Sequence, residues 1–138
     1  MDTDRAIGAE ATITARVGAG DSADAYGNDG LEVLATPALV GLFERAAMQA
    51  VAGLLDATER TVGSVVEMAH EAPTAVGAEV MVTARVEAVE GARVWFVVRA
   101  EDAAGQVASG RHARFVVDDA RFRGRAAKRL EGGGSPGG

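Results

Sequence analysis

The sequence predicts an α+β fold in which an antiparallel β-sheet wraps one long central helix. The segment "TPALVGLFERAAMQAV", residues 36–51, is apolar nearly all round when wound as a helix, which indicates burial on most sides. An alternating stretch at 11–17 precedes it and reads as a half-buried strand. Four β-rich segments, separated by short turn signals, follow it at about 61–72, 78–89, 92–102 and 106–118. These strands can supply the wrapping that such a helix needs.

The turns between these elements have recognisable sequences. Residues 18–30, "GAGDSADAYGNDG", are dense in Gly and Asp and predict a flexible loop that could cover a site. Thr36 before Pro37 is a helix-start signature, because Thr can cap free amides and Pro is tolerated in the first turn. The helix should run to about Leu55. Glu90-Gly91 predicts a tight hairpin, and "DAAGQ" predicts a second one.

The length of 138 residues fits one domain with a single core. We expect this domain to span residues 1–120 and a flexible C-terminal tail to span 121–138. Five basic residues lie between Arg121 and Arg129; they form either a solvated helix end or a site that attracts an anion such as a nucleotide phosphate. The last seven residues are only Gly, Ser and Pro and are expected to be disordered.

Charge and composition exclude several classes of function. A net charge of −6 has the wrong sign for broad nucleic-acid binding, and the absence of Cys excludes thiolate chemistry. The acidic N-terminus has no apolar leader, and no apolar run reaches the roughly 20 residues of a membrane helix, so we expect a cytoplasmic protein without membrane contact. Motifs for serine-elbow hydrolases, phosphate loops and Rossmann reductases are missing. Two histidines 42 residues apart give little reason to expect a metal, and no cofactor is expected.

Glu44 is the first candidate for chemistry, because it falls on an apolar stripe of the predicted helix with Val40, Ala47 and Val51. A buried glutamate costs several kcal/mol unless it is paired or protonated, and such groups often perform acid-base work. The alternative is that Glu44 tips to the helix surface and pairs with Arg45 or a strand arginine. Geometry alone leaves both open.

Other candidates lie at the helix start and on the strands. Thr36 reads as a cap, yet a hydroxyl at a helix N-terminus also suits an anionic intermediate. His70 ends an apolar strand face, as either a core residue or a base. Gly63 is a bulge or a place where a ligand approaches the backbone, and His112 with Arg114 on one strand face reads mainly as structural.

These segments together resemble a known family. The helix "TPALVGLFERAAMQAV", the strand ending in "VEMAH", "EAPTAVGAEVMVTARVEAVEG" and "GQVASGRHARFVV" resemble the hot dog fold thioesterases, in particular the fluoroacetyl-coenzyme A thioesterase family, over about residues 8–118. Thr36, Glu44 and His70 match that family's Thr, Glu and His without a gap. Gly63 and Arg114 also fall at matching positions.

The resemblance implies an acyl-coenzyme A thioesterase of the hot dog fold, which we expect to be a homodimer with sites shared between two chains. Thr36, Glu44 and His70 would be catalytic, with Glu44 as nucleophile or general base. The substrate-binding set would be Gly63, Val33, Leu39, Phe43, Met68 and Arg114. The substrate would be a small or medium acyl group on coenzyme A or an acyl carrier, with coenzyme A as part of the substrate.

The lid of that family carries phenylalanines before the helix. The corresponding stretch here, "AYGNDGLEVLATP", has glycines and Val33 but no Phe, so selectivity for fluoroacetyl-coenzyme A is not expected. Two other functions remain open. One is a non-catalytic acyl-thioester-binding module of the same fold, and the other is an enoyl-thioester hydratase.

Overall fold

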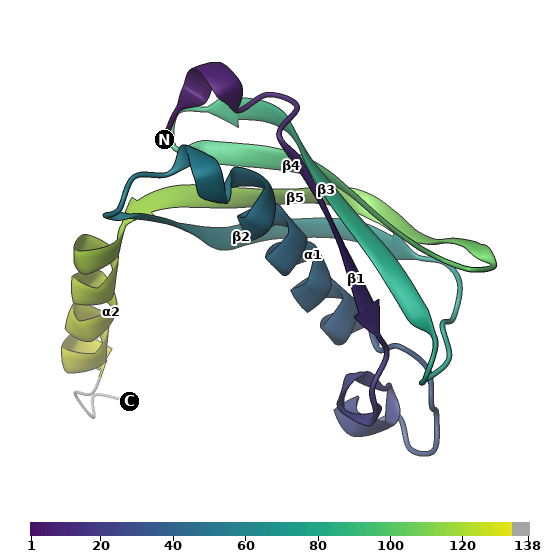
Figure 1. Ribbon diagram of the computed structural model, residues 1–138. Coiled ribbons are helices and arrows are strands. Elements are labelled where there is room, and N and C mark those ends of the chain that lie inside the picture. The colour runs from purple at the N-terminus through teal and green to yellow at the C-terminus, as the bar shows by residue number, and fades with distance from the viewer. Residues whose placement is uncertain (134–138) are drawn as a thin grey trace.

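The computed structural model describes residues 1–133, with one sheet, one long helix within it and a second helix at the C-terminal end (Figure 1). Short 3₁₀ turns occupy Thr3–Arg5, Ala19–Asp21, Asp24–Tyr26 and Ala52–Leu54. The helices and strands are β1 Glu10–Arg16, α1 Thr36–Val51, β2 Glu59–His70, β3 Glu79–Glu90, β4 Arg93–Asp102, β5 Gly105–Asp118 and α2 Asp119–Gly133.

The sheet is fully antiparallel, with the strand order β1-β3-β4-β5-β2. Helix α1 crosses one face of this curved sheet, while β1 and β2 form its two edges (Figure 1). The predicted α+β fold with one long helix is therefore confirmed. The strand order could not be read from the sequence, because hairpin signals fix only neighbouring strands.

The core fills the space between α1 and the sheet. Phe43 from α1 and Phe96 from β4 are fully buried in it. Around them lie mostly Val and Ala, as expected for a chain with few aromatic residues: Val51, Val80, Val82, Val86, Val94, Val98, Ala46 and Ala47. Alternate residues of β3 and β4 face this core, since side chains of a strand point to opposite faces of its sheet.

The start of α1 differs from the prediction. Ala35 is the N-cap residue, no side chain caps the helix, and Thr36 is already the first helical residue. The prediction that Thr36 caps the helix is therefore wrong, because its hydroxyl bonds to His70 Nδ1 instead. Pro37 does lie in the first turn, where its missing N–H costs nothing. The helix ends at Val51 and continues only as a 3₁₀ turn to Leu54.

Both predicted hairpins are present. The chain turns between Glu90 and Arg93, and Gly91 has a φ of 61°, which favours glycine. The second turn joins Asp102 to Gly105. Strand β2 begins and ends two residues earlier than predicted, whereas the other strands agree to within one residue.

The loop over residues 18–35 is more structured than its composition suggests. It contains two 3₁₀ turns and a bridge between Ser22 and Leu34. Backbone hydrogen bonds tie it to the start of α1, from Ala35 N–H to Asp21 O, and to the segment after β2, from Leu34 N–H to Thr74 O. It therefore has a defined shape beside the N-terminus of α1.

The basic C-terminal segment forms α2, which projects from the end of β5 away from the sheet (Figure 1). All of its residues are exposed or half-buried. Disorder was predicted for the last seven residues, which is wrong for Gly132 and Gly133, because they are the last two residues of α2. Residues 134–138 lie outside the described residues. Within residues 1–133, no helix is both long and apolar enough to span a membrane.

Candidate active site

Thr36 and His70 form a pair at the N-terminus of α1. The Thr36 hydroxyl lies 2.8 Å from His70 Nδ1, so the first residue of the helix is joined to the last residue of β2. His70 Nε2 is buried and is the one buried side-chain polar atom without a hydrogen-bond partner among residues 1–133. A buried imidazole nitrogen normally has a partner. Because His70 Nε2 has no such partner among the described residues, it is available to bind a ligand or to transfer a proton.

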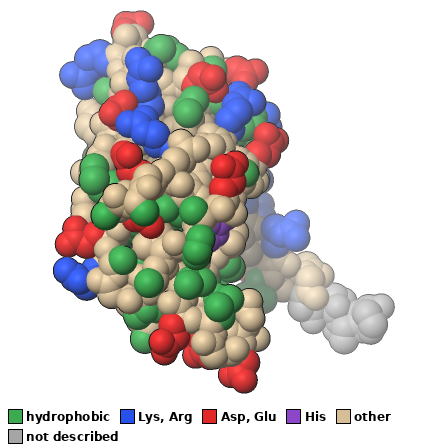
Figure 2. All heavy atoms as spheres, turned by 90° about the vertical axis from the view of Figure 1, so that its right-hand side faces the viewer, with side chains coloured by type: hydrophobic (Ala, Val, Ile, Leu, Met, Phe, Trp, Pro, Cys, Tyr) green, Lys and Arg blue, Asp and Glu red, His purple; other side chains and the backbone are tan. Residues whose placement is uncertain are grey.

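The pair borders a cavity of about 290 Å³. One wall comes from the loop before α1, through Ala23, Leu31 and Val33, and another comes from Glu71 to Pro73 after β2. On this side of the molecule, Figure 2 shows a partly covered histidine among hydrophobic side chains. The cavity thus combines apolar side chains with a few polar ones, as small-molecule sites usually do. The polar side chains are those of Thr36, His70, Asn28 and Glu71.

Glu44 lies in a second group of polar residues. Its Oε2 accepts a hydrogen bond from Arg114 Nη1 at 3.0 Å, and its side chain is 37% exposed while that of Arg114 is 3% exposed. The alternative in which Glu44 pairs with a strand arginine is therefore the observed one, and the carboxylate is not wholly buried. The ion pair holds this carboxylate in one position at the edge of the apolar core.

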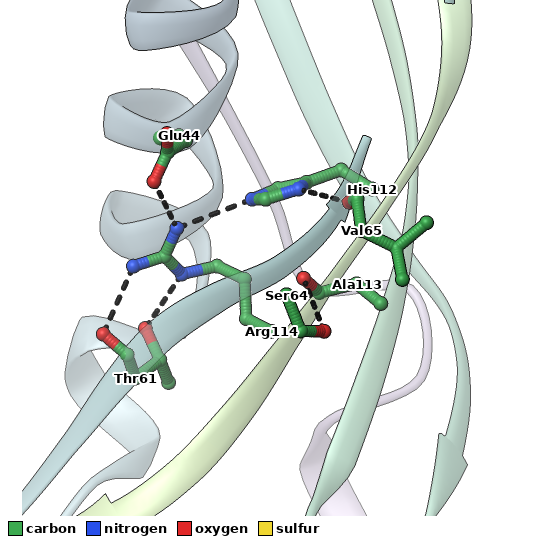
Figure 3. Close-up of polar contacts among 7 residues, drawn as sticks. All are labelled: Glu44, Thr61, Ser64, Val65, His112, Ala113 and Arg114. Carbon is green, nitrogen blue, oxygen red and sulfur yellow. Dashed lines mark hydrogen bonds and ion pairs between the residues drawn. The ribbon is translucent and has the colours of Figure 1, made fainter. Parts of the chain in front are cut away.

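Arg114 is the centre of this group (Figure 3). Besides Glu44, its guanidinium donates to the hydroxyl and the carbonyl oxygen of Thr61, both at 2.9 Å, and to His112 Nε2 at 3.1 Å. The sequence placed His112 and Arg114 on one strand face, but it gave no signal for Thr61. Finding Thr61 required the register in which Gly63 of β2 pairs with Arg114 of β5.

His112 is a neutral member of this group. Its Nδ1 donates to the Val65 carbonyl oxygen at 2.8 Å, and its Nε2 accepts from Arg114. Burial lowers the pKa of the His112 imidazole below its usual 6.5; the Val65 carbonyl and Glu44 oppose that shift, while the positive charge of Arg114 adds to it. The Phe96 ring is stacked on the imidazole, with 6.0 Å between ring centroids.

The lowered pKa predicts a pH-dependent stability. Because the unfolded chain binds a proton on His112 at a higher pH than the folded chain, the free energy of unfolding should fall as the pH drops below about 6.5. Urea unfolding at several pH values between 8 and 5 would measure the slope. His112→Gln cannot titrate, so the variant should lose this part of the slope; an unchanged slope would contradict the assignment.

Gly63 explains why Glu44 can reach Arg114. A Cβ at Gly63 would lie 2.8 Å from Glu44 Oε2 and 3.4 Å from Arg114 Nη1, which is too close for the carboxylate to stay. The strand register also shifts between Gly63 and Val65, so the predicted bulge is present. Gly63 therefore makes room for a side chain of this protein, and its contact with a substrate stays a prediction.

The two groups do not meet within one chain. Thr36 and Glu44 are eight residues apart on α1, a rise of about 12 Å. The predicted catalytic set is thus divided into a Thr36–His70 pair and a Glu44–Arg114 pair. A proton transfer needs contacts of roughly 3 Å. A single site that uses all these residues would therefore have to take one of the two pairs from a second chain.

The predicted binding residues also separate. Val33 lines the cavity beside His70. Leu39 and Phe43 are fully buried in the core, and Met68 is partly buried against that core. None of these three borders the cavity, so the structure gives them a packing role. Their contact with an acyl group stays a prediction.

A larger cavity of about 610 Å³ lies at the ends of β3 and β4. Its charged side chains are the carboxylates Glu79, Glu101 and Asp102, and among the described residues no imidazole or cationic side chain that could bind a phosphorylated substrate lines it. Among residues 1–133, no group of three or more His, Asp or Glu side chains could hold a metal ion. The cavity beside His70 is therefore the candidate active site.

The antiparallel sheet around one long helix is the architecture of the hot dog thioesterases. The family model described as fluoroacetyl-CoA-specific thioesterase matches residues 17–120. This chain belongs to that family. The match ends as α2 begins.

Individual relatives agree with the family assignment. The fluoroacetyl-CoA thioesterase of Streptantibioticus cattleyicolor is 35% identical over 102 residues, which are 74% of this chain and 73% of the relative. A crystal structure of the fluoroacetyl-CoA thioesterase FlK superposes with a TM-score of 0.83 at 29% identity, covering 89% of this chain and 96% of FlK. A hot-dog-like protein from Thermanaerovibrio acidaminovorans gives a TM-score of 0.83 at 27% identity, covering 90% and 92%.

Proposed function

We propose that this protein hydrolyses the thioester of a small or medium acyl-coenzyme A at the cavity beside Thr36 and His70. The observation that carries the proposal is that the buried Nε2 of His70 has no hydrogen-bond partner within residues 1–133 and lies at the wall of a cavity lined by both apolar and polar residues. Relatives support the substrate class, because a variant of FlK has been crystallised with acetyl-CoA; it superposes with a TM-score of 0.85 at 29% identity, covering 89% of this chain and 97% of FlK.

The proposal includes a homodimer that unites the two polar pairs. Strand β2 is an edge of the sheet and is paired with β5 on one side only. Several of its residues, such as Ser64 and Val66, are exposed. Unpaired edges favour pairing with another chain. If two copies pair antiparallel along β2, His70 of one copy lies near the Gly63–Glu44 region of the other. Glu44 of the partner subunit would then complete the Thr36–His70 site.

Each side chain has a role in this reaction. Glu44 acts on the thioester carbon as a nucleophile, giving a transient anhydride, or as the base that removes a proton from water. Its ion pair with Arg114 orients the carboxylate for either role. If Glu44 is the nucleophile, the carbon–sulfur bond breaks as the anhydride forms, His70 supplies a proton to the departing thiolate, and a water molecule then cleaves the anhydride into free Glu44 and the carboxylic acid. If Glu44 is the base, the deprotonated water adds to the thioester carbon, and the carbon–sulfur bond then breaks with the same proton transfer from His70. Backbone amides at the α1 N-terminus and at Gly63 stabilise the oxyanion.

The Thr36–His70 hydrogen bond sets the proton on the imidazole. If Nδ1 donates to Thr36 Oγ1, Nε2 is free to accept a proton; if the Thr36 hydroxyl donates to Nδ1, Nε2 carries a proton to give. The pair can therefore serve as base and then as acid within one catalytic cycle. Proton transfer through Nε2 also accounts for its lack of a protein partner.

We infer a substrate range that is not restricted to fluoroacetyl-coenzyme A. The loop side of the cavity is lined by Ala23, Leu31 and Val33, without a phenylalanine that would shape it around a two-carbon acyl group. Coenzyme A or an acyl carrier could bear the thioester, and a cytoplasmic location stays a prediction. No cofactor is part of this proposal.

Incubation with a panel of acyl-coenzyme A esters and a thiol reagent tests the activity. Release of free thiol is the expected result, with fluoroacetyl-coenzyme A giving no large preference over acetyl and butyryl esters. A change in the absorbance of an enoyl ester without free thiol would instead show a hydratase. Binding of the esters without either signal would show a non-catalytic module, and both outcomes would overturn the proposal.

Thr36→Ala should lower kcat without a matching loss of stability. Because Thr36 caps no amide and bonds to His70, the variant should lose imidazole orientation but not the roughly 1 kcal/mol of a helix cap. Thr36→Ser keeps the hydroxyl and is the matched control. Kinetics and thermal unfolding of the three proteins would measure both effects; a lower melting temperature with unchanged kcat would contradict this role.

A further inference from the structure

Helix α2 carries a basic and an apolar surface that nothing in one chain covers. It has five basic residues against two acidic ones. Arg123 pairs with Asp119 at 2.9 Å, and the other four form no ion pair with a residue of 1–133: Arg121, Arg125, Lys128 and Arg129. Phe122 and Leu130, eight residues apart on one side of the helix, are 37% and 76% exposed. Such a helix fits a partner that is acidic and partly apolar.

The loop over residues 18–35 is acidic, whereas α2 is basic. The sequence contains no Lys or Arg between Val17 and Glu44. Tyr26 and Leu31 are 56% and 44% exposed, and Figure 2 shows acidic but no basic side chains at the lower end of that face. The loop has four carboxylates, and none of them is in an ion pair among the described residues: Asp21, Asp24, Asp29 and Glu32.

These two surfaces lie at opposite ends of β2. Helix α2 is fixed at one end, where Asp119 N–H donates to Thr58 O at 2.9 Å and Arg60 pairs with Asp119 at 2.7 Å. The loop is fixed at the other end, beyond His70, through its bond to Thr74 O. Figure 1 shows both projecting to the same side of the sheet. About 36 Å of strand separates them, so they do not meet within one chain.

We infer that α2 of each subunit docks on the 18–35 loop of a second copy of this chain. The inference rests on the proposed dimer, because antiparallel pairing along β2 brings the Thr58 end of one subunit beside the His70 end of the other. The basic side chains of α2 would then face the carboxylates of the loop, and Phe122 and Leu130 would cover Tyr26 and Leu31. Because the loop borders the cavity, this contact would hold it over the Thr36–His70 pair.

Disulfide trapping tests the contact, since the chain contains no cysteine. One chain would carry Leu130→Cys and the other Leu31→Cys, with different tags, and the two would be co-expressed and oxidised. A covalent heterodimer on a non-reducing gel is the expected main product, because a disulfide needs Cα atoms within about 7 Å. Ile7→Cys, at a site that is 62% exposed, is the matched control for chance collision and should give little product.

Charge reversal tests the chemistry of the contact. The triple variant Arg125→Glu, Lys128→Glu, Arg129→Glu should lower the yield of the linked heterodimer at least roughly tenfold, and Asp29→Lys with Glu32→Lys in the other chain should restore it. A dimer in light scattering without the linkage would overturn this inference and leave the proposed dimer standing. A monomer would overturn both. A third outcome is that no linkage forms and the triple charge-reversal variant has a higher KM for acyl-coenzyme A but an unchanged KM for acyl-pantetheine. That result would overturn the inference and show that α2 binds the phosphates of the substrate.

Discussion

Glu44→Gln and His70→Ala are each expected to lower kcat at least roughly 100-fold, the scale of a positioned acid or base. Glutamine keeps the size of Glu44 but cannot attack the thioester or remove a proton. Alanine at His70 removes the imidazole that lines the cavity. KM should change less than kcat, because both side chains are proposed to act on the reacting atoms and not to bind the substrate. Steady-state kinetics with the best ester of the panel would measure both constants.

The matched control for these variants is Glu87→Gln. Glu87 pairs with Arg111 on the surface and lies outside the cavity beside His70, so its replacement should leave kcat within about twofold. Circular dichroism and thermal unfolding would show that the low-activity variants are folded. Hydrolysis close to the unaltered rate in both Glu44→Gln and His70→Ala would remove these residues from the mechanism.

Arg114→Met is expected to cause the largest loss of stability among the residues of the site. Methionine replaces the aliphatic part of the side chain but leaves the Thr61 carbonyl oxygen and His112 Nε2 without their donor. Each unsatisfied buried acceptor costs about 1–3 kcal/mol, so we expect a loss of roughly 3 kcal/mol in the free energy of unfolding. Urea unfolding at pH 7.5 would measure it. Activity should fall too, because Glu44 loses its partner.

Arg111→Met on the same strand is the control for Arg114→Met. The side chain of Arg111 is 48% exposed and pairs with Glu87 at 3.2 Å, and its guanidinium lies over the Trp95 ring at 4.4 Å. Exposed ion pairs contribute about 1 kcal/mol or less, so this variant should lose far less stability. Equal losses in the two variants would show that the buried hydrogen bonds of Arg114 contribute little.

Local patterns in the sequence predicted most of the fold. The alternation of β3 and β4, the glycine of the first hairpin and the apolar helix all depend on neighbouring residues, and each agrees with the structure. Strand order depends on contacts between distant segments, so the edge position of β2 was not predictable. The Thr36 cap was wrong for a related reason: its hydroxyl bonds to His70, 34 residues away.

The sequence supplied candidate residues for the site but not their arrangement. The resemblance to the family singled out Thr36, Glu44 and His70, whereas helix geometry separates Thr36 from Glu44 by about 12 Å. The partner of Glu44 was open between Arg45 and a strand arginine, and only the pairing of Gly63 with Arg114 selects the latter. Thr61 has no distinguishing pattern in the sequence, because its place beside Arg114 depends on the pairing of β2 with β5.

A mixed dimer tests most directly whether two subunits share each site. One chain would carry Glu44→Gln and the other His70→Ala, with different tags, so that the heterodimer can be purified from co-expressed protein. If Glu44 of one subunit serves the Thr36–His70 pair of the other, one site in the heterodimer is intact and the other has lost both residues. We predict about half of the unaltered activity per dimer, compared with at least roughly 100-fold lower activity in each homodimer. Activity as low as that of the two homodimers would contradict the shared site.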